Sequence, residues 1–287
     1  INAVSLSAFL IPNASISCAP NFMSPLARLL RKNALPMVPQ PVDLSPSLKK
    51  IDGVRYLVWD LYGTLLMSTA GTDQNASLHE TTLRSLLLDS SELPHFSLSV
   101  HLRNLIAQDH AQSRKSGIDF PEVNILEIWR RFFKSLDLSP PSNIEEFALR
   151  FDFMTNPCRP FPGAKKALSH PATIGLISNA QFYTPLLLEA FSLPVPKLTF
   201  YSYLDRQAKP GTFLFEKFLK DGPPPEEILY IGNDLLNDIA PAHRIGMRTV
   251  LFAGDTRSFR PRPRRSDLPR PDAILTSLEQ VKQHLNE

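Results

Sequence analysis

The chain is poor in cysteine, in net charge and in long apolar runs. Its 287 residues include two cysteines, Cys18 and Cys158, and neither stands at a spacing typical of metal ligands. So few cysteines favour a reducing compartment, and we expect a cytoplasmic protein. The formal net charge of +3 is too small to indicate a nucleic-acid-binding protein. Without a run of 18 or more apolar residues, no membrane span is expected.

Residues 1–50 look like an N-terminal extension. No acidic residue precedes Asp43, and no positive charge precedes the apolar run at 3–12, so the pattern of a secretory signal is weak. Residues 24–32 can form a short basic amphipathic helix. This leaves open organellar targeting by residues 1–35, or a segment translated from upstream of the true start. We expect most of residues 1–45 to be poorly ordered or loosely docked.

A short motif after the first predicted strand organises the chain. Apart from Arg55, residues 54–59 are apolar, β-branched or aromatic, and they predict a buried parallel strand that ends at Asp60. Gly63 predicts a tight turn, with the Thr64 hydroxyl beside it. Ligands bind at the carboxyl ends of strands in open α/β sheets. Asp60 is therefore a candidate nucleophile or metal ligand, and the alternative is an aspartate that caps the turn.

The stretch after this motif carries helical patterns and no strand pattern. Residues 67–72 are largely small and polar and predict a flexible excursion beside the site. Trp129, Phe132 and Phe133 fall on one face of a predicted helix, and we expect them to form a core rather than a substrate box. Pro121 stands at a helix-opening position. The predicted helices span 79–88, 98–115, 121–136 and 142–153.

From residue 160 onward, strands and helices alternate. This predicts a parallel sheet with helices on both faces. Polar groups follow three strands: Ser178 and Asn179 the first, Lys209 the second, and Asp234 with Asp238 the third. Each is weak alone, because a serine at a strand end is more often a helix cap than a ligand. The predicted strands are 172–177, 197–201, 227–231, 248–252 and 273–275, and the helices are 164–170, 181–191, 212–219, 239–245 and 278–285.

Taken together and in order, these residues resemble the motifs of the haloacid dehalogenase-like (HAD) superfamily. The run V-W-D-L-Y-G-T-L-L resembles motif I, in which the first aspartate, here Asp60, attacks the substrate and forms an aspartyl intermediate. Ser178 resembles the hydroxyl of motif II, and Lys209 resembles the lysine of motif III. Asp234 and Asp238 resemble the carboxylates of motif IV, which hold Mg²⁺.

The resemblance covers about residues 54–285 and implies the architecture. An all-helical insertion after motif I resembles the cap domain of HAD proteins. The expected fold is α/β, with a Rossmann-like parallel-sheet core at 51–66 and 160–287 and an all-helical cap domain at 67–159.

The resemblance also implies a hydrolase that acts on a small, anionic molecule, with no nucleic-acid or membrane partner. Asp60 and Lys209 would be catalytic, and a cation beside them would remove the repulsion between a carboxylate and a phosphate dianion. The implied substrate-binding residues are Tyr62, Thr64, Ser178 and Asn179. The implied ligands of Mg²⁺ are Asp60, the main-chain carbonyl of Tyr62, Asp234 and Asp238.

Two residues depart from the motifs of HAD phosphatases. Tyr62 stands where a second aspartate usually protonates the leaving alkoxide, and a phenol with a pKa of about 10 is a poor substitute. Tyrosine here resembles the haloacid dehalogenases proper, whose halide leaving group needs no proton and which use no metal. Asn233 precedes Asp234, which leaves open which of the two is the main motif IV ligand; the four-residue step to Asp238 favours Asp234.

We therefore expect a Mg²⁺-dependent phosphatase that prefers good leaving groups, such as acyl or aryl phosphates. The alternatives are a metal-free 2-haloacid dehalogenase and a catalytically weak HAD-like binding protein.

Six arginines lie among prolines between residues 257 and 270. A solvated surface loop is favoured there over a phosphate- or nucleic-acid-binding loop, because the net charge is low and no aromatic platform accompanies them.

Overall fold

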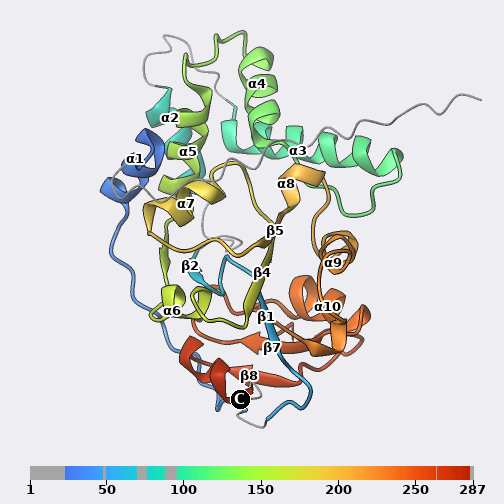
Figure 1. Cartoon of the computed structure of the whole chain (residues 1–287). Helices are drawn as coiled ribbons and strands as arrows, with labels where there is room; N and C mark the ends of the chain where they lie inside the picture. Colours follow the sequence, from blue (N-terminus) through green and yellow to red (C-terminus); the bar gives the residue numbers. More distant parts are fainter. Residues whose placement is uncertain (1–22, 48–49, 70–75, 88–95, 263, 285–287) are drawn as a thin grey trace, which may run out of the picture.

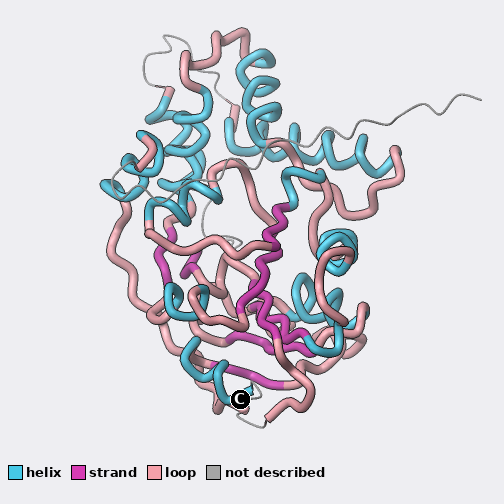
Figure 2. The backbone as a smooth tube through the Cα atoms, in the orientation of Figure 1, coloured by secondary structure: helices cyan, strands magenta, loops and turns pink. Residues whose placement is uncertain are grey.

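The protein divides into a strand-containing core and a group of helices above it. The computed structural model describes residues 23–47, 50–69, 76–87, 96–262 and 264–284. In Figure 1, helices α2 to α5 gather at the top of the view and the sheet lies in the lower half. Figure 2 shows the same division, with the strands near the centre of the core and helices around them.

A parallel sheet forms the core, as the alternation of strands and helices predicts. The described strands run in the order β5-β4-β1-β6-β7-β8, and every neighbouring pair is parallel. The chain adds strands on one side of β1 and then crosses to the other, so the carboxyl ends of β1 and β6 flank a crevice of the kind in which ligands bind. The strands are β1 (Tyr56–Trp59), β4 (Thr173–Ser178), β5 (Leu198–Tyr201), β6 (Ile228–Gly232), β7 (Arg248–Phe252) and β8 (Ala273–Leu275).

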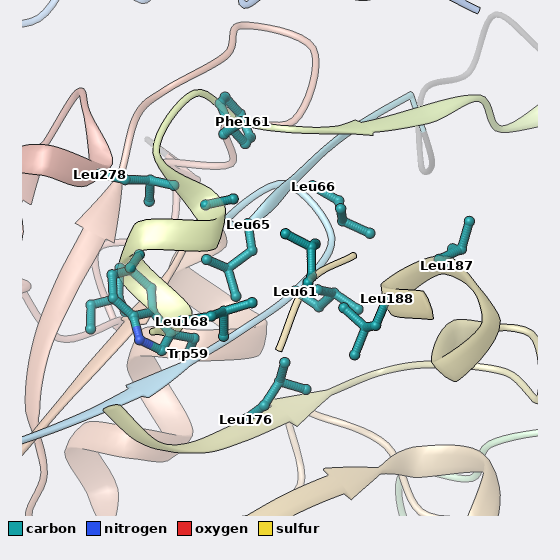
Figure 3. Packing of buried hydrophobic residues seen from close by; sticks show 14 of the residues in the cluster. Trp59, Leu61, Leu65, Leu66, Phe161, Leu168, Leu176, Leu187, Leu188 and Leu278 are labelled. Atoms are coloured by element: carbon teal, nitrogen blue, oxygen red, sulfur yellow. The ribbon is translucent and has the colours of Figure 1, made fainter. Parts of the chain in front are cut away.

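Helices bury an apolar cluster on each face of this sheet. One cluster contains Trp59, Leu61 and Leu176 together with residues of α6 and α7 (Figure 3). The other contains Val58 and Phe215 together with residues of α9 and α10. The helices of the core are α6 (Ala164–Leu168), α7 (Thr184–Ala190), α8 (Ser202–Asp205), α9 (Phe213–Leu219) and α10 (Ala240–Arg244), with 3₁₀ turns at Pro225–Glu227 and Leu278–His284.

Two predicted helices of the core differ in type. The helix expected over 278–285 is the 3₁₀ helix Leu278–His284. The helix expected over 239–245 begins earlier, as a π-helical turn at Leu235–Ile239 that leads into α10. The side chain of Asp234 accepts hydrogen bonds from main-chain N–H groups of this turn, which fixes its start.

The cap has an aromatic core of its own. Trp129 makes edge-to-face contacts with Phe132, Phe147 and Phe151, and this confirms the expected core role of Trp129 and its neighbours. Helix α4 begins four residues later than predicted, because Asn124 caps it and Pro121 pairs with the core residue Gln207. The cap helices are α2 (Ala76–Leu86), α3 (Leu98–Lys115), α4 (Ile125–Ser135) and α5 (Ile144–Thr155).

A two-stranded antiparallel ribbon joins core and cap. Strand β2 (Leu66–Ser68) pairs with β3 (Cys158–Pro160), so the chain leaves for the cap and returns from it side by side. We expected a flexible excursion over 67–72; residues 67 and 68 instead lie in a strand, and residues 70–75 lie outside the described part. The side chains of β2 are all buried, so no alternating pattern marked it as a strand.

The N-terminal segment is docked more firmly than expected. Helix α1 (Pro25–Asn33) packs on α7, with Ala27 and Leu30 buried. Ser24 caps α1 and also donates a hydrogen bond to Glu189 of α7. Residues 1–22, where targeting was considered, lie outside the described part. No helix among the described residues is long and apolar enough to cross a membrane.

Candidate active site

Asp60 lies at the carboxyl end of β1, in the crevice beside β6. Its main-chain N–H donates to the carbonyl of Ile231 on β6, at 2.8 Å, which continues the pairing of the two strands. The following turn needs Gly63, whose φ is +86°. A side chain on Gly63 would also overlap Asn233. The sheet and this turn together hold the Asp60 carboxylate in place, with 4% of the residue exposed.

Both oxygens of the Asp60 carboxylate accept hydrogen bonds. Oδ1 accepts from Lys209 Nζ at 2.7 Å and makes a longer contact of 3.4 Å with Ser178 Oγ, at the end of β4. Oδ2 accepts from Thr64 Oγ1 at 3.1 Å. The structure thus brings together the predicted residues of motifs I, II and III, although Asp60 is separated from the other two by more than 100 residues of sequence.

Lys209 is a buried cation between two carboxylates. Its Nζ lies 2.7 Å from Asp60 and 2.5 Å from Asp238, and also contacts Tyr230 Oη at 3.1 Å. Burial alone would favour neutral Lys209, but Asp238 and Asp60 oppose it and raise the pKa of Lys209 well above its usual value. The lysine therefore stays charged and can neutralise an anion that arrives at Asp60.

Asn179 holds the main chain of Lys209. Its Oδ1 accepts from the Lys209 N–H at 2.8 Å and its Nδ2 donates to the Lys209 carbonyl at 3.0 Å. The sequence left open a contact with substrate or a capping role. The geometry shows a third arrangement, in which Asn179 links the end of β4 to the loop that carries the lysine. Asn179 also lines the pocket described below.

The two neighbouring residues of motif IV have different surroundings. Asn233 Oδ1 accepts from Thr64 Oγ1 at 3.2 Å, so this amide oxygen shares a hydroxyl with Asp60. The Asp234 carboxylate instead caps the π-helical turn and forms a two-pronged ion pair with Arg262, at 3.1 and 2.5 Å. Asn233 is therefore linked to the Asp60 carboxylate through the Thr64 hydroxyl, whereas Asp234 is not; the sequence had favoured Asp234 as the main motif IV ligand.

Both oxygens of the Asp238 carboxylate accept hydrogen bonds, one from Lys209 and one from the main chain of Asp234. Its Oδ1 accepts from Lys209, and its Oδ2 accepts from the Asp234 N–H at 3.0 Å. Burial raises the pKa of Asp238, and the charge of Lys209 opposes this. Asp238 thus orients Lys209 and the backbone that carries Asn233 and Asp234.

Two oxygen atoms at this site are of the kind that Mg²⁺ binds in proteins. Among the residues that the structure describes, no group of three or more His, Cys, Asp or Glu side chains is placed to hold a metal. However, Mg²⁺ usually binds to one or two carboxylates and completes its shell with waters and substrate oxygens. Asp60 Oδ2 and Asn233 Oδ1, which both contact Thr64, supply hard oxygen donors of this kind.

Tyr62 is poorly suited to donate a proton at neutral pH. Its hydroxyl hydrogen-bonds Thr184 Oγ1 at 2.9 Å, at the start of α7. Burial, together with nearby Cys158 and Asp152, raises the pKa of Tyr62 well above its usual value. The phenol therefore keeps its proton and serves as a fixed wall of the site.

A pocket of about 450 Å³ opens between core and cap at these residues. Several of its polar residues were not predicted from the sequence, because no local motif marks them: Glu122, Asp152 and Asn156 from the cap side, and Gln181 and Tyr183 from the core.

The arginine-rich loop is not simply a solvated surface. Arg260 and Arg262 line the pocket, against the expectation for this segment, and Arg257 is paired with the buried Asp255. Arg262 faces Asp234, whereas no carboxylate lies within ion-pair distance of Arg260 in the described structure. Burial lowers the pKa of Arg260, and Asp234 opposes this. The loop folds inward because main-chain hydrogen bonds join Arg260 to the segment that follows β6.

Comparison with known proteins identifies the fold. Residues 207–281 match the model of the HAD-hydrolase-like family. No curated protein sequence matches the chain. A 2-haloacid dehalogenase from Pseudomonas syringae pv. tomato is 18% identical, with a TM-score of 0.55, and the match covers 80% of this chain and 97% of that one.

Two further solved structures, one of a phosphatase and one of a dehalogenase, show the same fold. A HAD phosphatase from Thermococcus onnurineus is 17% identical, with a TM-score of 0.50, over 80% of this chain and 97% of that one. The L-2-haloacid dehalogenase from Xanthobacter autotrophicus, with chloropropionic acid covalently bound, is 13% identical, with a TM-score of 0.50, over 79% and 96%. The fold and the family match agree with the motifs at Asp60, Ser178 and Lys209: the chain has the HAD fold, with a group of helices inserted after the first motif, and its residues 207–281 match the HAD-hydrolase-like family.

Proposed function

We propose that this protein is a Mg²⁺-dependent phosphatase or phosphotransferase that acts on a small anionic molecule through an aspartyl-phosphate at Asp60. The observation that carries the proposal is the buried Asp60 carboxylate, bound at Oδ1 by Lys209 and at Oδ2 by Thr64 within a polar pocket. A charged lysine beside a carboxylate nucleophile is what attack on an anionic phosphate requires.

The proposed reaction has two halves. First, an Asp60 oxygen attacks phosphorus, the bond from phosphorus to the leaving oxygen breaks, and the leaving oxygen takes a proton. Water then attacks the phosphorus of the aspartyl-phosphate, which regenerates the carboxylate and releases phosphate. Lys209 neutralises charge on Asp60 and on the phosphoryl oxygens, and Ser178 Oγ donates to one of these oxygens.

Mg²⁺, when bound, would lower the repulsion between the carboxylate and the phosphoryl oxygens. Asp60 and Asn233 are the side chains that we propose to hold it, with the main-chain carbonyl of Tyr62 as a further donor. Asp234 would join them on release from Arg262. Asp238 contributes indirectly, because it holds Lys209 and the Asp234 N–H.

Tyr62 favours a second candidate function, the hydrolysis of 2-haloacids. A halide leaving group needs no proton, so a site with tyrosine at this position suits that chemistry as well. Both dehalogenases and a phosphatase are among the similar structures described above, and at below 20% identity they support the fold without choosing between the reactions.

The test measures hydrolysis of acetyl phosphate and p-nitrophenyl phosphate with and without Mg²⁺, and halide release from 2-haloacids. Turnover of the phosphates that requires Mg²⁺ supports the proposal. Halide release without phosphate turnover would replace it with the dehalogenase. If neither reaction occurs, while isothermal titration detects binding of small anions, the protein is a binding protein with a HAD fold.

A further inference from the structure

The proposed phosphatase lacks an obvious proton donor on the core. An alkoxide leaving group needs a proton as its bond to phosphorus breaks, and general acid help is worth ~10²–10⁴-fold. Tyr62 lies two residues after the nucleophile, within motif I, but its hydroxyl is hydrogen-bonded to Thr184 and its pKa is raised by burial. The proton must therefore come from another group that reaches the same pocket.

Most of the other acidic side chains that line the pocket are already engaged. Asp234 is ion-paired with Arg262, and Asp238 with Lys209. Glu122 accepts from Gln181 Nε2 at 3.0 Å and from Ser202 Oγ at 2.7 Å, so it ties a cap loop to the core. Asp234 and Asp238 thus pair with cations, and the nearby Arg206 favours the ionised form of Glu122. Asp152 also lines the pocket, and the groups that hydrogen-bond it, Asn156 and Tyr183, are neutral.

We propose that Asp152, on the cap helix α5, is the general acid and base of the phosphatase reaction; this inference rests on the proposed function. Asp152 lines the pocket together with Asp60. It accepts hydrogen bonds from Asn156 Nδ2 at 3.2 Å and from the hydroxyl of Tyr183. Asp152 reaches this pocket from the cap helix α5, whereas Asp60 reaches it from the end of β1 in the core.

The surroundings of Asp152 raise the pKa of its carboxyl group toward neutrality, so the protonated form is populated in slightly acidic solution. Burial raises its pKa to about 6, and hydrogen bonds from Tyr183 and Asn156 oppose this only in part. The titratable groups that face it are Tyr62, from the turn after β1, Tyr183, before α7, and Cys158, on β3. Burial raises the pKa of each of these groups, so all three are neutral at pH 7 and none holds the Asp152 carboxylate as a cation would.

The proposed proton transfers balance over the cycle. Asp152 gives its proton to the ester oxygen as the bond from phosphorus to that oxygen breaks, and Asp152 becomes a carboxylate. It then takes a proton from the water that attacks the aspartyl-phosphate and returns to its starting state. The net reaction is ester plus water to alcohol plus phosphate, and Tyr183 and Asn156 stabilise the intermediate carboxylate.

A series of leaving groups tests this role. We would measure kcat/KM of wild-type protein and of Asp152→Asn with acetyl phosphate, an aryl phosphate and an alkyl phosphate. Protonation of the leaving group matters most for the alkyl ester, because an alkoxide is the poorest leaving group of the three. Asp152→Asn should therefore lower kcat/KM by ~10²–10⁴-fold with the alkyl phosphate and by less than about tenfold with acetyl phosphate. The matched control is Glu145→Gln, an exposed carboxyl group on the same helix, which should leave all three values unchanged.

The pH profile gives an independent readout. A general acid must be protonated to act, so wild-type kcat/KM with the alkyl ester should fall as pH rises through about 6. The kcat/KM of Asp152→Asn should not show this fall. Equal losses on all three substrates would show a structural role and overturn the inference. So would an unchanged alkyl rate. Failure of wild-type protein to hydrolyse acetyl phosphate would instead reject the proposed function itself.

Discussion

Replacing Asn179 by alanine should loosen the catalytic lysine without touching its ammonium group. Asn179 makes two hydrogen bonds to the main chain of Lys209, at 2.8 and 3.0 Å. At ~0.5–1.5 kcal/mol for each net hydrogen bond, the free energy of unfolding should fall by about 1–3 kcal/mol. A displacement of a catalytic group by ~1 Å costs ~10²-fold in rate, so kcat with acetyl phosphate should fall by about that factor.

Two assays on the same preparation test this reasoning. Urea denaturation reports the loss of stability, and steady-state kinetics report the loss of turnover. The control is Asn33→Ala. The Asn33 side chain lies at the exposed end of α1 and donates to the Leu29 carbonyl within the same helix, so its loss should change neither value by much. If Asn179→Ala is folded and retains wild-type kcat, the position of Lys209 does not depend on Asn179, and the reasoning is refuted.

Three further predictions follow from single contacts. Gly63→Ala should destabilise the protein by more than ~1 kcal/mol in denaturation and abolish turnover, because φ is positive there and a Cβ would displace Asn233; wild-type turnover would contradict this. Arg262→Ala should free Asp234 and strengthen Mg²⁺ binding several-fold in isothermal titration; weaker binding would contradict it. Burial would raise the pKa of Glu80, but hydrogen bonds from the start of α3 outweigh this and lower it to about 2. The Glu80 carboxylate therefore stabilises the folded protein above the unfolded-state pKa of about 4.5, and this stabilisation is lost as the pH falls from about 4.5 to 2. Glu80→Gln should therefore flatten the acid-unfolding curve between pH 4.5 and 2, and an unchanged slope would exclude this role of Glu80.

The core could be predicted because its signals are local. Buried parallel strands are continuous apolar runs, and residues 56–59 and 228–231 stand out for that reason. Polar residues at their carboxyl ends meet at one edge of the sheet, so the amino-acid sequence alone was enough to place Asp60, Ser178 and Lys209 together. The cap helices were equally visible from their 3.6-residue periodicity.

The residues that line the pocket from the cap could not be predicted in this way. Asp152 and Glu122 lie on or beside helices whose patterns predict only burial, and their approach to Asp60 depends on how the cap docks. The orientations of Asn233 and Asp234 are also set at long range. Asn233 lies against Gly63, and Asp234 meets Arg262, so neither contact is marked by the spacing within motif IV.

The central claim is that Asp60 is the nucleophile and becomes phosphorylated. The most direct measurement is mass spectrometry of protein quenched in acid during turnover of acetyl phosphate, after digestion to peptides. We predict that the peptide containing Asp60 gains the mass of one phosphoryl group. Asp60→Asn, once circular dichroism has shown that it folds, should show neither the adduct nor turnover. Turnover with no adduct on Asp60, or an adduct on another residue, would contradict the claim.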